Sequence, residues 1–147
     1  QNVLPHVLKK CPESKFMLAG GVCDCIPDYP GVYKLGKVAC LEDFYNNVKV
    51  VINPIQNGTG LNIKTIEALA YGKPLVTNSI GAKGISNKEK ILFECNDPAT
   101  FADQIVMVLK NNALCKEVIK NAQEYIANYN KMNIKTLYSI ENYISNK

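Results

Sequence analysis

Residues 53–74 contain the residue types and spacing in this chain that could do chemistry. A glycine-rich turn at residues 58–61 comes directly before a run of good helix formers that ends at Gly72 and Pro74. Glycines let backbone amides approach a ligand, and the unpaired amides and dipole of a helix start attract an anion. The pattern predicts a phosphate-bearing ligand at the turn, with ordinary turn glycines as the alternative.

The segments around this turn alternate between short apolar strands and helices. Such alternation predicts an α/β fold, a Rossmann-like doubly wound parallel sheet with helices on both faces. The expected strands cover residues 15–19, 32–38, 48–52, 74–77 and 91–94. The expected helices cover residues 1–10, 41–47, 61–71, 98–110, 113–128 and 132–145. Because a doubly wound domain should begin with a strand, we expect a first strand upstream of Gln1.

Side-chain positions within these helices follow from periodicity and capping rules. Asp97 is a typical helix cap, with Pro98 at the first helical position. Leu41, Phe44 and Tyr45 are expected to turn inward. The helix at 98–110 aligns Phe101, Ile105, Val108 and Leu109, and the apolar stripe of the last helix consists of Ile134, Leu137, Tyr138 and Ile144.

Three loops leave the carboxyl ends of the expected strands, at residues 20–31, 53–60 and 78–84. In open parallel sheets ligands bind beside these ends, so we expect the loops to line one cleft. Ser79 and Gly81 are then either ligand contacts or parts of a turn.

Composition predicts one ordinary globular domain, residues 1–147, with 47% hydrophobic and 20% charged residues. No apolar run approaches the roughly 18 residues of a membrane span. The net charge of +4 comes from lysine, since the chain has no arginine. The lysines stand singly, which argues against a nucleic-acid partner and fits either a phosphate ligand or a plain solvated surface.

The six cysteines and one histidine give no strong catalytic signal. Cys23 and Cys25 are the one close pair, and their spacing is unusual for zinc, so reduced thiols are expected, with metal binding as the alternative. His6 lies in a helical pattern far from the glycine turn, which favours a packing or surface role over that of a catalytic base.

The order of elements and the loop sequences resemble the C-terminal, donor-binding half of two-domain GT-B glycosyltransferases of the family 4 (group 1) type. The similarity runs through a first helix containing "VLP", a strand ending at Ala19-Gly20-Gly21, and "YKLGKV". Its most specific part is "VVINPIQNGTGLNIKTIEALAYGKPLVTNSIGAKGI", residues 50–85.

This resemblance implies a set of donor-binding residues. Backbone amides would hold the diphosphate at Gly58, Thr59, Gly60 and Leu61. Glu67 would bind the ribose hydroxyls and Lys64 would add positive charge near the phosphates, unless the two simply pair with each other or lie at the surface. The base would be held by the main chain of Gly36, Lys37 and Val38. Many members carry an acid where this chain has Gln56-Asn57, so Asn57 is only a candidate sugar contact.

The resemblance also implies a function: a retaining glycosyltransferase that moves a hexose from a UDP- or GDP-sugar to a polysaccharide or glycolipid, without cofactor or metal. The acceptor domain would be an N-terminal half that precedes Gln1, and the present chain alone would be inactive. The parent enzyme is expected in the bacterial cytoplasm, with the inner face of the membrane as an alternative. A non-catalytic Rossmann-like module is the rival. A dehydrogenase is disfavoured because G-x-G-x-x-G is absent. No catalytic residue is assigned.

Overall fold

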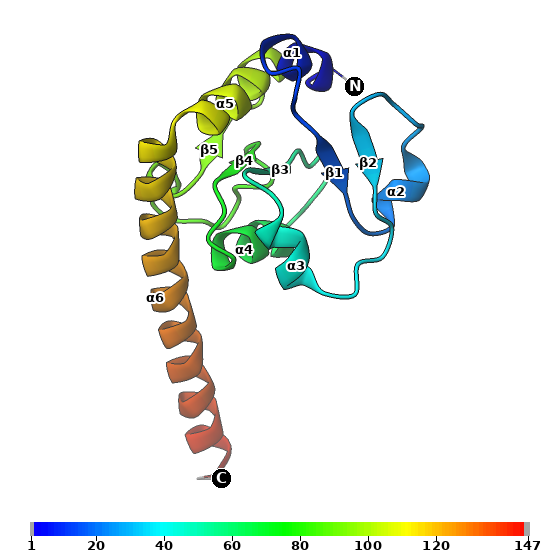
Figure 1. The fold of residues 1–147 in the computed structure, drawn as a ribbon. Helices are drawn as coiled ribbons and strands as arrows, with labels where there is room; N and C mark the ends of the chain where they lie inside the picture. Colours follow the sequence, from blue (N-terminus) through cyan, green and yellow to red (C-terminus); the bar gives the residue numbers. More distant parts are fainter. Residues whose placement is uncertain (1, 146–147) are drawn as a thin grey trace.

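The computed structural model describes the backbone of residues 2–145 and the side chains of residues 2–137. The strands are β1 (Phe16–Leu18), β2 (Val32–Lys34), β3 (Val51–Asn53), β4 (Leu75–Thr77) and β5 (Phe93–Glu94). The helices are α1 (Leu4–Lys10), α2 (Val22–Cys25), α3 (Leu41–Asn46), α4 (Ile63–Ala70), α5 (Pro98–Lys110) and α6 (Asn112–Ser145), with the 3-10 turn η1 (Lys88–Lys90). Figure 1 shows their arrangement.

All strand pairs are parallel, which confirms the predicted α/β class. β3, β4 and β5 form one sheet in that order, and β1 pairs with β2 in a second. The Rossmann-like arrangement of parallel strands is thus confirmed, but over the described residues it is divided into two sheets, because β1 and β3 do not pair and each keeps one edge without a partner strand. A strand upstream of Gln1 stays a prediction.

Helices cover both faces of the larger sheet because β4 alternates its side chains between two apolar cores. Leu75 packs with Tyr45, Leu69 and Ala122, from α3, α4 and α6. Val76 points to the other face, into the core built by α1 and α5. β4 is buried throughout and is the centre of the fold. The carboxyl ends of β3 and β4 are thereby fixed side by side, with α4 starting next to them.

The C-terminal region is one continuous helix, α6, and the prediction of two helices at 113–128 and 132–145 is wrong. No proline or glycine lies between residues 112 and 145, so nothing in the sequence stops the helix at the expected break. Its first half packs on the body through Ala122, while the second half runs away from it (Figure 1). Ile134 and Leu137, two residues of the predicted apolar stripe, are 51% and 60% exposed. Tyr138 and Ile144 lie outside the described side chains.

Smaller differences concern the first half of the chain. The short helix α2 interrupts the predicted 20–31 loop, and β2 ends at Lys34 rather than at residue 38. Leu41 was expected inside but is 40% exposed at the start of α3, whereas Tyr45 is buried as predicted. At the start of α5 the predicted cap is confirmed, since the Asp97 carboxylate accepts the Thr100 amide at 2.8 Å.

The cysteines and the histidine take no part in an assembled polar centre. All six cysteines are free thiols, and His6 is exposed on α1. Among the described residues there is no group of three or more side chains able to hold a metal ion. No described helix combines the length and the apolar character needed to cross a bilayer.

Candidate functional site

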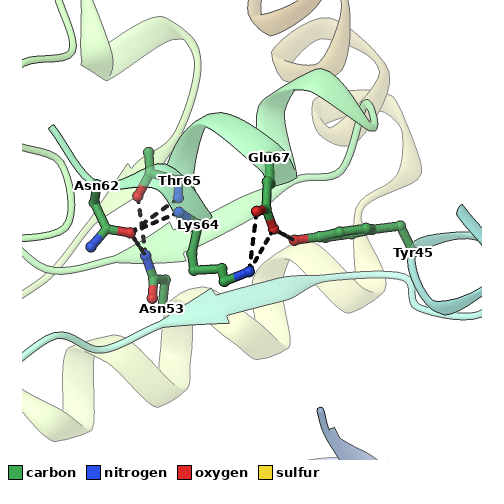
Figure 2. Close-up of polar contacts among 6 residues, drawn as sticks. All are labelled: Tyr45, Asn53, Asn62, Lys64, Thr65 and Glu67. Atoms are coloured by element: carbon green, nitrogen blue, oxygen red, sulfur yellow. Dashed lines mark hydrogen bonds and ion pairs between the residues drawn. The ribbon is translucent and has the colours of Figure 1, made fainter. Parts of the chain in front are cut away.

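The site is built around the start of α4, which Asn62 caps (Figure 2). The Asn62 side-chain oxygen accepts the amides of Lys64 and Thr65 at 3.0 and 3.3 Å. Asn62 has extended backbone, so helical geometry begins at Ile63 rather than at the predicted Leu61. This leaves residues 58–61 outside the helix, directly ahead of its positive end.

A hydrogen-bond network ties this helix start to the ends of β3 and β4. The Asn53 side-chain amide, at the end of β3, donates to Asn62 Oδ1 at 3.0 Å and to Thr65 Oγ1 at 3.1 Å. The Thr65 hydroxyl is buried and donates in turn to the Gly81 carbonyl at 2.7 Å. The Thr77 hydroxyl donates to the Asn53 carbonyl at 2.7 Å. The network fixes where α4 starts relative to the sheet edge.

The same network brings two of the three predicted loops together. Asn78 donates from its side-chain amide to the Ile55 carbonyl and accepts the Gly81 amide at 3.0 Å. The 53–60 and 78–84 loops are thus hydrogen-bonded to each other, while the cleft expected between the loops stays a prediction. The 20–31 loop instead begins with a bond from the Gly20 amide to the Gly36 carbonyl, at 2.6 Å.

The glycine turn itself is open to solvent. Every residue from 56 to 61 is exposed, and a Cβ on Gly60 would meet no heavy atom within 4 Å. In the described part of the chain, the amides of residues 58–61 donate to no protein group. Neither Gly58 nor Gly60 has left-handed backbone, so the turn does not need glycine for its φ angles. What these glycines provide is bare, accessible backbone.

Lys64 and Glu67 lie one helical turn apart on α4. They form an ion pair with each other, which the sequence analysis gave as an alternative to donor binding. The Lys64 ammonium donates to both carboxylate oxygens of Glu67, at 3.1 and 2.9 Å. The Lys64 side chain is 64% exposed and that of Glu67 is 23% exposed. The pair lies at the protein surface, where such contacts contribute little to stability.

Tyr45 is a further partner of Glu67 that sequence patterns did not identify. Its hydroxyl donates to Glu67 Oε2 at 3.3 Å. Tyr45 as a whole is 4% exposed, and its ring stacks on Tyr71, with the ring centroids 4.4 Å apart. Burial, followed by the nearby Glu67 charge, raises the pKa of the Tyr45 hydroxyl well above its usual range. The Tyr45 hydroxyl therefore stays protonated at physiological pH and can donate its hydrogen bond to Glu67.

The remaining predicted contacts lie in different surroundings. Gly36 has left-handed backbone (φ +62°) just after β2, followed by exposed Lys37 and half-buried Val38. Among the described residues, no hydrogen bond or ion pair joins these three residues to the turn ahead of α4. Asn57 and Ser79 are exposed, and the Ser79 amide is held by the Asn96 side chain at 3.0 Å.

Gly81 has a packing reason to be glycine. It is buried, and a Cβ there would come within 2.1 Å of the Thr77 hydroxyl oxygen and 3.1 Å of the Asn53 carbonyl. The absence of a side chain lets the 78–84 loop lie against the ends of both strands. The structure thus accounts for Gly81 without a ligand, while the donor contacts proposed for the other residues stay predictions.

Comparison with known proteins gives the family. The model of the family described as Glycosyl transferases group 1 matches residues 1–111. A Klebsiella pneumoniae protein, named as an uncharacterized 44.6 kDa protein in the cps region, is 28% identical over 138 residues. That match covers 85% of this chain and 36% of the Klebsiella protein.

Solved structures show the same fold. A glycosyltransferase from Rickettsia africae ESF-5 superposes with a TM-score of 0.75 at 18% identity, covering 99% of this chain and 44% of that one. HepE of Anabaena, solved in complex with UDP and glucose, gives a TM-score of 0.75 at 17% identity, with 94% and 44% coverage. The present chain therefore spans less than half the length of each of these relatives. It belongs to the glycosyl transferases group 1 family.

Proposed function

We propose that this chain is the donor-binding domain of a glycosyltransferase and that it holds a nucleotide-diphospho-sugar at the start of α4. The observation that carries the proposal is the row of four exposed amides at residues 58–61, which have no protein acceptor and lie ahead of a capped helix. Phosphate oxygens are the natural acceptors for such amides. Further support comes from HepE of Anabaena, which has been solved with UDP and with UDP-glucose.

The residues that follow the turn would serve the rest of the donor. Lys64 lies in the first turn of α4, where its ammonium can approach a diphosphate held at residues 58–61. Glu67 is one turn further along and would accept ribose hydroxyls. Amides and an ammonium aimed at the diphosphate would also stabilise the charge that develops on it as the sugar leaves. Gly36, Lys37 and Val38 would hold the base through their backbone.

The whole enzyme, in this proposal, transfers a hexose from a UDP- or GDP-sugar with retention of stereochemistry. Its acceptor domain would be a separate N-terminal half, consistent with the 44% coverage of the solved relatives, and residues 1–147 would be one domain. The name of the Klebsiella relative, with its cps region, supports a polysaccharide or glycolipid acceptor. We propose that the enzyme works in the cytoplasm, needs no metal for donor binding, and is inactive when reduced to this chain.

Calorimetric titration tests the proposal on the chain as it stands. We expect weak but saturable binding of UDP or GDP and of their sugars, reduced by Glu67→Ala. Glu124→Ala removes an exposed glutamate that forms no ion pair with any other described residue and is the matched control. At 100 times its dissociation constant, the nucleotide should also stabilise the fold by about 2.7 kcal/mol.

The absence of heat with all these ligands, together with unchanged thermal stability, would contradict donor binding. It would favour the rival, a non-catalytic Rossmann-like module. Equal affinities of the wild type and Glu67→Ala would leave nucleotide binding intact but remove Glu67 from the site.

A further inference from the structure

Protein groups already occupy most of the hydrogen-bond acceptor positions of the Glu67 carboxylate, which limits how a ligand can bind to it. A carboxylate offers about four lone-pair positions, two on each oxygen. Oε2 accepts both the Lys64 ammonium and the Tyr45 hydroxyl, while Oε1 accepts Lys64 alone. About one position is therefore left. A vicinal diol that donates a hydrogen bond from each of its two hydroxyls to Glu67 needs two free positions, one more than are left.

The two protein partners differ in how easily they can leave. Tyr45 is buried in the core between α3 and α4, and its ring is held against Tyr71. Lys64 is mostly exposed, on a flexible side chain in the first helical turn. Figure 2 shows the two groups meeting Glu67 from different sides, Tyr45 from α3 and Lys64 from the helix start. Lys64 is the partner that can move, and it lies in the first turn of the helix that the exposed residues 58–61 precede.

We propose that Tyr45 is a positioning residue that holds Glu67 in place for a ribose diol, and that Lys64 is an exchangeable partner. Lys64 covers the carboxylate in the free protein and transfers to the diphosphate when the nucleotide binds. The inference rests on the proposed function and adds to it, because the site then selects ligands that carry both a diol and a diphosphate. A nucleoside without phosphate has to displace Lys64 with no new partner for the ammonium.

Titrations with UDP and with 2′,3′-dideoxy-UDP test the role of Tyr45. Tyr45→Phe keeps the stacked ring and removes only the hydroxyl, and Tyr71→Phe is the matched control because the Tyr71 hydroxyl makes no hydrogen bond in the structure. We expect Tyr45→Phe to weaken UDP binding between about twofold and tenfold, the usual range for one hydrogen bond. Binding of the dideoxy nucleotide should not change, and Tyr71→Phe should change neither.

The ratio of the two affinities separates positioning from a general loss of structure, because a partly unfolded variant loses both ligands equally. An equal loss for both nucleotides would thus overturn the role of Tyr45, as would no loss for either. The Glu67→Ala background gives a second measurement: there Tyr45→Phe should have no further effect on UDP binding, since its action runs through Glu67. A further loss in that background would also overturn the inference.

Lys64→Met tests the exchange. Its control is Lys49→Met, because Lys49 precedes β3 and lies at the opposite end of the sheet. Loss of Lys64 should weaken UDP binding about tenfold or more. Uridine should bind unchanged or up to about twofold more tightly, because the pair it must break is an exposed one. Weaker uridine binding in this variant would show that Lys64 supports the diol contact and would overturn the exchange. If the wild type binds none of the probes, the proposed function fails. If it binds UDP and dideoxy-UDP equally, nucleotide binding stands, and the ribose contact of Glu67 fails together with the present inference.

Discussion

Replacing Gly81 by alanine tests how the ends of β3 and β4 are joined to the start of α4. The new methyl group would lie 2.1 Å from Thr77 Oγ1, far inside the contact distance of about 3.4 Å or more that carbon and oxygen keep. Thr77 is fully buried, and its hydroxyl donates to the Asn53 carbonyl at 2.7 Å. The methyl group and this hydrogen bond cannot both be accommodated.

The expected cost has two parts. Overpacking in a well-packed core costs about 1–3 kcal/mol. Loss of the hydrogen bond from Thr77, with buried groups left unsatisfied, adds about 1–3 kcal/mol. We therefore expect Gly81→Ala to lower the free energy of unfolding by between about 2 and 6 kcal/mol, a large share of the 5–15 kcal/mol or so that holds a domain together.

Urea denaturation followed by circular dichroism measures this change. Gly60→Ala is the matched control, because its new methyl group meets no atom within 4 Å, and it should stay within about 0.5 kcal/mol of the wild type. In a Thr77→Ala background the clashing oxygen is gone, so Gly81→Ala should cost at least about 1 kcal/mol less there. Equal effects of Gly81→Ala and Gly60→Ala, or strict additivity with Thr77→Ala, would refute the packing argument.

Three further predictions concern the cap, the core and Tyr45. Asn62→Ala should destabilise the fold by about 1 kcal/mol in urea titrations, since it removes the cap of α4, whereas Asn57→Ala in the exposed turn should have little effect. Leu69→Ala, at a fully buried site, should lower the free energy of unfolding by about 2–5 kcal/mol. Leu137→Ala, on the exposed half of α6, should lower it by less than about 0.5 kcal/mol. Similar values for the two variants would contradict the assignment of core and surface. Because the pKa of Tyr45 is raised in the folded state above its ordinary value of 10.0, its stabilising effect should be complete below about pH 10 and be lost as the pH rises further. Tyr45→Phe should make that alkaline loss less steep by up to about 1.4 kcal/mol per pH unit, and identical slopes in denaturation titrations from pH 9 to 11 would speak against a buried, protonated Tyr45.

Much of the fold follows from local sequence signals. Periodicity identified every strand of the structure to within a few residues, and the Asp97–Pro98 pair marked the start of α5 correctly. The break expected in the last helix was wrong because the polar residues near position 130 are weak helix formers but not helix breakers. The half of α6 beyond that point has apolar residues at helical spacing, and periodicity alone does not tell whether a partner covers them.

The candidate site was predictable in its location but not in its contacts. The glycine turn and helix start are local patterns, so residues 58–67 could be singled out from the sequence. Asn62 also carried a usable signal, as a typical cap residue next to the first helical position. Tyr45 and Asn53 did not, because their bonds to Glu67 and Thr65 join residues 22 and 12 positions apart in the chain. Such pairings depend on tertiary packing, which sequence spacing does not encode.

Amide resonances of the turn give the most direct test of the central claim, that this chain holds a nucleotide diphosphate at the start of α4. In ¹H–¹⁵N spectra of the labelled chain, added UDP should shift the signals of Gly58, Thr59, Gly60 and Leu61 the most, with saturation at one common dissociation constant. The hollow lined by Lys88 and Gln104, on another part of the surface, should not respond. Shifts confined to that hollow, or none at the turn at saturating UDP, would contradict the account.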